Sequence, residues 1–219
     1  MLSTSCFDDI IQQMVWNYGG LIMYIFWDNS NIHISGLQVM KEKEPTQQQE
    51  LFRTDFNNLF DLVRKKRTVD AAYLSGSIPP PNNALWDYLK NMGIQLQLLT
   101  KSADGGEQES VDMSLQTMML RTAIDNIENP STIAILTGDG AGKQLGEGFL
   151  SDLQRIHKMG WKIEVYSWEN SCNRYLKEFA QENGAFIALD DYYECITFLK
   201  EDRYNPTGHK VRESKSLPL

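Results

Sequence analysis

The chain has 219 residues, of which 42% are hydrophobic and 23% are charged, and its formal charge is −8. This composition is ordinary for a globular protein that is long enough to bury one sizeable core. The negative charge argues against a protein that only coats nucleic acid, but it leaves open an enzyme whose acids hold divalent cations against phosphate.

The cysteine usage and the apolar runs favour a cytoplasmic protein without a membrane association. The three cysteines, Cys6, Cys172 and Cys195, are far apart and form no CxxC pair. Neither a disulfide framework nor a zinc site is therefore expected, which suits a reducing compartment. The first residues include acids and no early Lys or Arg, unlike a signal peptide. The longest apolar run, LIMYIFW at 21–27, is too short to cross a bilayer.

Alternating strand and helix patterns follow one another along the chain. Residues 6–17 predict a short helix, and the continuously apolar run at 21–27 predicts a strand that is buried on both faces. Short apolar runs bounded by turn residues predict further strands at 69–76, 94–99, 132–136, 162–168 and 186–189. Helical periodicity predicts helices over 46–66, 82–92, 111–127, 147–159 and 172–182, with DDYYECITFL (190–199) as a last helix.

This alternation predicts an α/β fold with a doubly wound, mainly parallel sheet and helices on both faces. We expect a helical extension over 1–20, one domain over 21–200 and a flexible tail over 201–219. Ligands of such sheets bind outside the carboxyl ends of the strands, where the strand order switches direction.

Three acids are expected near that edge. Asp28 follows the first strand directly, Asp139 follows the fourth, and Asp112 lies near the start of the helix after the third. If the first and fourth strands are neighbours, Asp28 and Asp139 converge. Carboxylates so close together would repel one another unless a cation lay between them, and their hard oxygens suit Mg²⁺ or Mn²⁺. Such ions assist phosphodiester hydrolysis in nucleases.

The glycine-rich stretch LTGDGAGKQ at 136–144 offers another interpretation, a phosphate cradle. A Walker A loop needs a glycine five residues before Gly142, where Thr137 stands, and a hydroxyl after Lys143, where Gln144 stands. The dinucleotide-binding pattern fails on spacing as well. The stretch therefore favours a metal-binding role for Asp139.

Three motifs together, FWDNSN (26–31), SVDMSLQ (110–116) and LTGD (136–139), resemble the NYN domain of the PIN-like nuclease superfamily, in the branch that includes LabA-like proteins. The resemblance covers roughly residues 21–190. It implies a doubly wound sheet of PIN type, a divalent metal, ribonuclease activity with an endonuclease favoured, an RNA substrate and a homodimer.

By match of motif, Asp28, Asp112 and Asp139 take the metal-binding acid positions of the family. Asn31 takes the position of the first-motif Asn, which supports the metal site or a phosphate. Thr137 takes the small hydroxyl position before Gly-Asp. These positions make Asp28, Asp112, Asp139 and Asn31 the expected catalytic residues.

The chain departs from the family pattern at Ala141, where a second acid usually follows the third motif. Glu147 and Asp152 lie downstream and are candidates to replace it. The departure leaves open a non-catalytic NYN module that binds RNA or a partner protein as a regulator. A phosphatase or nucleotide hydrolase is a third class, and it lacks the expected second acid after Asp28 because residue 30 is Ser.

Substrate contacts are expected from the same edge of the sheet. Lys143 follows the fourth strand and Arg174 begins the helix after the fifth, so both are candidates to touch RNA phosphate. Four aromatic residues are candidates to stack on bases, although aromatic side chains more often pack in a core. These are Trp161, Trp168, Tyr192 and Tyr193.

Overall fold

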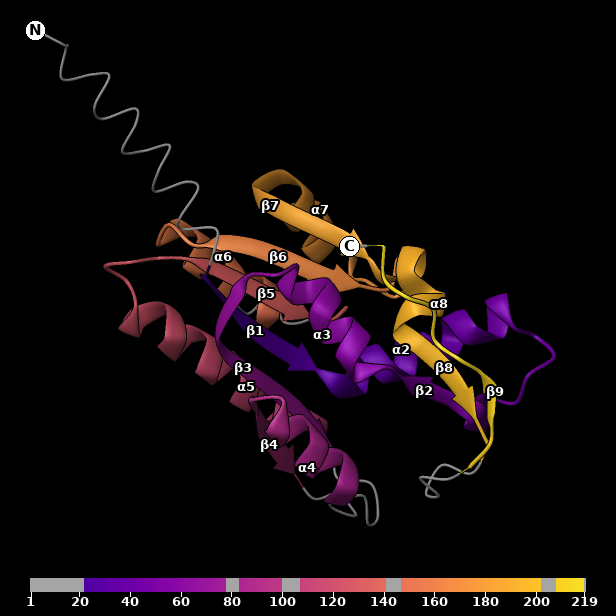
Figure 1. Ribbon diagram of the computed structural model, residues 1–219. Helices are drawn as coiled ribbons and strands as arrows, with labels where there is room; N and C mark the ends of the chain where they lie inside the picture. The colour runs from indigo at the N-terminus through magenta and orange to yellow at the C-terminus, as the bar shows by residue number, and fades with distance from the viewer. Residues whose placement is uncertain (1–21, 78–82, 100–106, 141–146, 202–207, 219) are drawn as a thin grey trace, which may run out of the picture.

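A six-stranded parallel sheet forms the centre of the protein (Figure 1). The computed structural model describes residues 22–77, 83–99, 107–140, 147–201 and 208–218. The strand order is β4-β3-β1-β5-β6-β7. The strands are β1 (Ile22–Asp28), β3 (Thr68–Ser77), β4 (Ile94–Leu99), β5 (Thr132–Leu136), β6 (Lys162–Ser167) and β7 (Gly184–Ala188).

Helices cover both faces of this sheet, which confirms the predicted α/β architecture. One face carries α2 (Asn29–Lys43), α3 (Phe56–Arg64), α4 (Asn83–Asn91) and α8 (Tyr193–Ile196). The other face carries α5 (Glu107–Asp125), α6 (Gly148–Lys158) and α7 (Arg174–Asn183). Within the described ranges, no helix has both the length and the apolar character needed to cross a membrane.

The central strand β1 owes its position to its uninterrupted apolar sequence. All of its residues after Ile22 are buried. Alternate side chains point to opposite faces, so Ile25 and Trp27 join the core under α2 and α3, while Tyr24 and Phe26 join the core under α5 and α6. A strand buried on both faces belongs in the interior of a parallel sheet.

A small antiparallel sheet was not expected from the sequence. It has the order β2-β8-β9, with β2 (Phe52–Thr54), β8 (Thr197–Lys200) and β9 (Lys210–Arg212). Strands β2 and β8 fall in the stretches that were predicted as helices, 46–66 and 190–199, and β9 falls in the predicted tail. In the two stretches only α3, α8 and two single-turn 3₁₀ segments (Gln49–Leu51 and Leu189–Tyr192) are helical. The helix α2 was not predicted either, because its apolar pattern is weak. Gly36 in α2 makes room for β2, since a Cβ there would lie 2.7 Å from the Phe52 ring.

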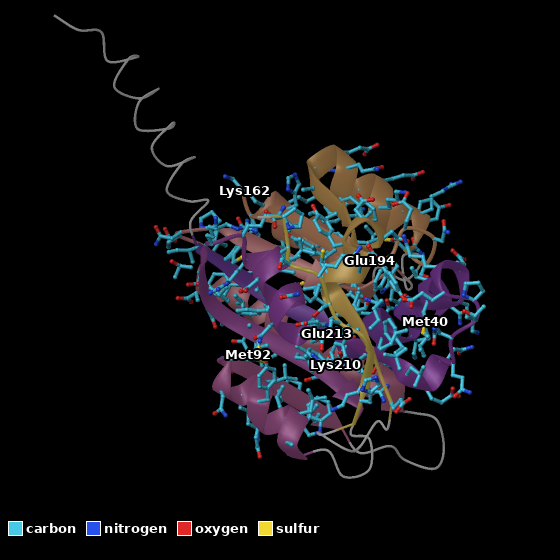
Figure 2. All side chains as sticks on the ribbon, turned by 45° about the vertical axis from the view of Figure 1, so that its right-hand side comes forward. Met40, Met92, Lys162, Glu194, Lys210 and Glu213 are labelled. Atoms are coloured by element: carbon cyan, nitrogen blue, oxygen red, sulfur yellow. The ribbon has the colours of Figure 1, made fainter. Side chains whose placement is uncertain are left out.

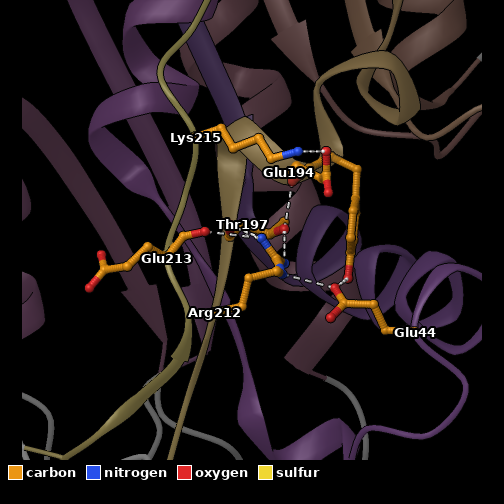
Figure 3. A network of polar contacts seen from close by, with 7 residues as sticks. Glu44, Glu194, Thr197, Arg212, Glu213 and Lys215 are labelled. Atoms are coloured by element: carbon orange, nitrogen blue, oxygen red, sulfur yellow. Dashed lines mark hydrogen bonds and ion pairs between the residues drawn. The ribbon is translucent and has the colours of Figure 1, made fainter.

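Residues 208–218 form part of the fold, whereas the sequence predicted a flexible tail from residue 201. Arg212 of β9 donates hydrogen bonds to the carbonyl and hydroxyl of Thr197, at 2.9 and 2.8 Å, and to Glu44 at 3.1 Å (Figure 3). Lys215 pairs with Glu194 of α8 (Figure 3), and Lys210 pairs with Glu213 (Figure 2). The polar composition suggested a solvated tail, but Arg212 and Lys215 form hydrogen bonds and ion pairs with residues outside the segment.

Candidate metal site at the switch of strand order

Strands β1 and β5 lie side by side at the point where the strand order reverses. From β1 the chain continues outward through β3 and β4, then returns to place β5 on the other side of β1 (Figure 1). Trp27 pairs with Leu136 in the parallel register, so the two strands end at the same level. Asp28 and Thr137 are therefore neighbours at the carboxyl edge, where ligands of such sheets bind.

The Asp28 carboxylate is buried at this edge, with the residue only 3% exposed. One oxygen accepts a hydrogen bond from the backbone N–H of Asn31, and the other accepts one from the Thr137 hydroxyl, both at 3.0 Å. The bond from Asn31 also caps α2, so Asp28 has a structural role in addition to its place at the edge.

Burial raises the pKa of Asp28 to about 6. The hydrogen bonds from Asn31 and Thr137 act in the opposite sense, and the negative charge of Asp139 adds to the rise. A positive ion at this edge would favour the ionised form of Asp28.

The loop after β5 is held from both sides. The Thr137 hydroxyl, which donates to Asp28, also accepts a hydrogen bond from the backbone N–H of Asp139 at 3.1 Å. The side-chain oxygen of Asn31 accepts a hydrogen bond from the N–H of Gly138 at 2.7 Å. The carbonyl of Gly138 accepts one from the N–H of Asn173 at 2.8 Å. Asp139 is therefore positioned by contacts to α2 and to the start of α7.

Glycines 138 and 140 are required by close packing against the start of α7. A Cβ at Gly138 would lie 2.8 Å from the carbonyl oxygen of Ser171, and a Cβ at Gly140 would lie 2.6 Å from the Asn173 side chain. Asn173 caps α7 by accepting hydrogen bonds from the N–H groups of Tyr175 and Leu176. The sequence made Asn173 a candidate, with Arg174, for a contact at the carboxyl edge, but it gave no role to Tyr175.

The other predicted residues fall in three groups. Asp112 lies in α5, at a position whose side chain is outside the described part of the structure. Lys143 and Ala141 lie outside the described residues altogether. Arg174 is the first residue of α7 and is strongly exposed, and its guanidinium pairs with Glu178 at 3.4 Å.

The two candidates for a replacement acid lie at the start of α6 and within it. Glu147 is an exposed residue that precedes α6, and its side chain makes no capping hydrogen bond. Asp152 is buried in α6 and pairs with Arg155 at 2.7 Å. Among the described residues there is no cluster of three or more His, Cys, Asp or Glu side chains. The donors that do meet, Asp28 and Asp139, present the hard carboxylate oxygens that suit a divalent cation.

The stacking candidates from the sequence are mostly core residues. Trp161, Trp168 and Tyr193 are each at most 2% exposed, and only Tyr192 is partly exposed. In contrast, Tyr175 in the first turn of α7 is 45% exposed. The sequence did not predict which aromatic side chains are buried and which are exposed, because the residues next to them in the chain do not distinguish the two.

Comparisons with known proteins agree with this architecture. The family model described as "NYN domain" matches residues 23–190. A crystal structure of a protein of unknown function, VPA0982 from Vibrio parahaemolyticus, is similar with a TM-score of 0.55 and 18% sequence identity. The similarity covers 79% of this chain and 95% of that one, and at this identity it concerns the fold.

One curated protein shares part of the sequence. The "Putative tyrosine-protein phosphatase OCA1" of Kluyveromyces lactis is 27% identical over 125 residues. These residues make up 56% of this chain and 56% of that protein, so the chain spans about half the length of this relative.

Proposed function

The chain belongs to the NYN domain family, and from this premise we propose that it is a divalent-metal-dependent nuclease that hydrolyses phosphodiester bonds in RNA. Nuclease activity follows from the PIN-like superfamily to which NYN domains belong. The observation that supports it in this chain is the meeting of Asp28 and Asp139 at the switch of strand order. We also propose that the substrate is RNA and that the RNA is cut internally.

The proposed ligands of the ion are Asp28, Asp139 and Asp112. When bound, Mg²⁺ or Mn²⁺ supplies an electrophile for a phosphate oxygen and lowers the pKa of a water molecule. The Thr137 hydroxyl orients Asp28 and the backbone of Asp139 together, because it bonds to both. Asn31 holds the Gly138 backbone and so fixes the loop that carries Asp139. Such supporting hydrogen bonds tune the orientation and basicity of metal ligands.

The name of the K. lactis relative raises a thiol-dependent phosphatase as a competing activity. A cysteine nucleophile requires a lowered pKa. Burial instead raises the pKa of Cys172 and, at a more exposed position, of Cys195. The third cysteine, Cys6, lies outside the described residues. The described thiols therefore do not support this activity, and the nuclease remains the proposal.

The decisive experiment is cleavage of a labelled single-stranded RNA by the full chain, with Mn²⁺, Mg²⁺ or EDTA. We expect cleavage with either ion, none with EDTA, and none by Asp28→Asn or Asp139→Asn. Asp61→Asn is the matched control and should cleave RNA as the wild type does. Asp61 is a half-exposed acid on α3 that pairs with Arg64. A circular RNA that is opened by the protein would establish internal cleavage.

Other outcomes would point to the alternatives. RNA binding without cleavage under any ion, unchanged by Asp139→Asn, would identify a non-catalytic binding module. Release of phosphate from p-nitrophenyl phosphate without RNA cleavage would identify a phosphatase. Ion binding has its own readout: Mn²⁺ should raise the melting temperature of the wild type and not that of Asp28→Asn.

A further inference from the structure

A groove of about 460 Å³ lies between α6 and α7, on the outer surface of their face of the sheet. Its walls include Gln154 and Lys158 of α6 and Tyr175 and Phe179 of α7. Neither the strand pattern nor the three motifs of the sequence predicted this groove, and the proposed catalytic residues do not line it.

Asn173 ties one end of this groove to the loop after β5 that carries Asp139, which we call the acid loop. The N–H of Asn173 donates to the carbonyl of Gly138, which directly precedes Asp139. The side-chain oxygen of Asn173 accepts from the N–H of Tyr175 at 3.0 Å. Tyr175 thus stands at the mouth of the groove that lies nearest to Asp139, on a backbone that the acid loop itself holds.

Tyr175 and Arg174 together expose a flat aromatic ring beside a cation. Tyr175 is 45% exposed, and the Arg174 guanidinium lies 5.0 Å from the centre of its ring. An exposed aromatic ring offers a surface on which a base stacks, and a neighbouring Arg binds phosphate or stacks as well. Core packing does not explain this ring, unlike the buried aromatic residues of β6 and α8.

The charges of the groove decide which part of a nucleotide it takes. Glu178 and Glu182 also line it and outnumber Lys158, so the charge of the lining disfavours a phosphate inside. A neutral base has no such penalty and can reach the Gln154 amide for hydrogen bonds. The cation Arg174 lies at the mouth, on the side of the acid loop. The base therefore enters the groove, and the backbone stays at the rim.

We propose that Tyr175 and Arg174 form a nucleotide platform for single-stranded nucleic acid, with a base on the Tyr175 ring and a phosphate at Arg174. The proposal rests on the proposed nuclease function, since the platform would hold a nucleotide next to the scissile bond. The faces of a base inside a duplex are covered by its stacked neighbours, so the platform selects single strands.

The test measures binding by the full chain in EDTA, where cleavage does not interfere. The probe is a fluorescein-labelled oligoadenosine of about ten nucleotides, followed by fluorescence anisotropy. Tyr175→Leu should raise the Kd roughly tenfold or more, whereas Tyr175→Phe should bind nearly as the wild type does. Tyr88→Leu is the matched control: Tyr88 is 41% exposed on α4, far along the strand order from α7, and its loss should leave the Kd unchanged.

A second readout isolates the phosphate contact. Arg174→Gln should reduce the slope of log Kd against log salt by about one. Arg64→Gln is its control, because Arg64 also pairs with an acid one helical turn away and lies near an aromatic ring, on the opposite face of the sheet. Equal melting temperatures of the Tyr175 variants would show that changes in Kd are not caused by unfolding.

The outcomes separate this platform from the nuclease. Unchanged binding by Tyr175→Leu, absence of binding by the wild type, or equally tight and equally Tyr175-dependent binding of a duplex would each overturn the platform. Mn²⁺-dependent cleavage together with Tyr175-independent binding would leave the nuclease in place without it. Tyr175-dependent binding without cleavage under any ion would keep the platform and reject the nuclease.

Discussion

The side-chain oxygen of Asn31 accepts a hydrogen bond of 2.7 Å from the N–H of Gly138, 107 residues further along the chain. This bond joins the first turn of α2 to the loop after β5 and so sets Asp28 and Asp139 relative to one another. It gives Asn31 a positioning role that does not depend on contact with substrate.

Replacing Asn31 should therefore weaken the site more than the fold. Asn31→Ala leaves the Gly138 N–H without its acceptor, which should cost about 1 kcal/mol of unfolding free energy. Cleavage should fall roughly 10- to 100-fold, as is usual when a residue that supports metal ligands is lost. Asn31→Asp keeps an oxygen that can accept from the Gly138 N–H. Comparing it with Asn31→Ala shows whether the lost hydrogen bond causes the fall in cleavage. Cleavage by Asn31→Ala at the wild-type rate would contradict this role.

Gly140→Ala should disturb the start of α7. The added Cβ would lie 2.6 Å from the Asn173 side chain, so either the loop or the helix cap must move. Urea unfolding should show a loss of about 1–3 kcal/mol. Gly76→Ala is the control, because its Cβ would meet only ordinary contacts at 3.6 Å or more. Adding Asn173→Gly, which removes the obstructing side chain, should restore much of the loss; no recovery would mean that the strain lies elsewhere.

The ordered C-terminal segment makes a measurable prediction about stability. Arg212 is about one-fifth exposed, and Arg212→Ala removes the hydrogen bonds that Thr197 and Glu44 accept from its guanidinium. The unfolding free energy should fall by about 2–3 kcal/mol. Lys210→Ala breaks an exposed pair with Glu213 and should cost less than about 1 kcal/mol. A loss for Arg212→Ala that is no larger than the loss for Lys210→Ala would show that the contacts of Arg212 contribute little to stability.

The pair of Arg67 and Glu164 predicts how stability depends on acid. Burial alone would raise the pKa of Glu164, but the two hydrogen bonds from Arg67, its charge and the Tyr166 hydroxyl outweigh it and leave the pKa below its ordinary value. A lowered carboxyl pKa stabilises the fold above the unfolded value of about 4.3. This contribution is lost as the pH falls through the lower folded value.

Glu164→Gln should therefore be less stable than the wild type near neutral pH. The difference in unfolding free energy should shrink progressively below about pH 4.3, because the wild type then loses the same interaction. Denaturant unfolding at a series of pH values measures it. A difference that stays constant down to the acid limit would show that the charge of Glu164 is not what stabilises the fold.

The central features of the fold and site were predictable because they follow from local patterns. A strand as apolar as β1 has to lie inside a parallel sheet, and an acid at its end has to lie at the carboxyl edge. That β5 neighbours β1 was an assumption from the sequence, and the pairing of Trp27 with Leu136 confirms it. The metal-binding roles of Asp28, Asp112 and Asp139 stay predictions, as do the phosphate contacts of Lys143 and Arg174.

The second sheet and the exposed ring of Tyr175 were not predictable, for a different reason. Three residues, Phe52–Thr54, form a strand only because β8 lies beside them, and β8 is more than 140 residues away in the chain. The pattern of a short segment carries no record of such a partner. Likewise, the exposure of Tyr175 depends on where Asn173 starts α7, and that start is fixed by the distant Gly138.

The position of β1 also affects how the chain folds. It precedes every other described strand, yet its two neighbours begin at Thr68 and Thr132. More than half of the chain must therefore be synthesised before both of its edges are paired. Until then an apolar, β-prone segment has open edges, which is the composition of an aggregation-prone stretch. Asp28 ends that stretch with a charge. The same carboxylate that is proposed to bind the ion can thus act as a gatekeeper against self-association while the chain is incomplete.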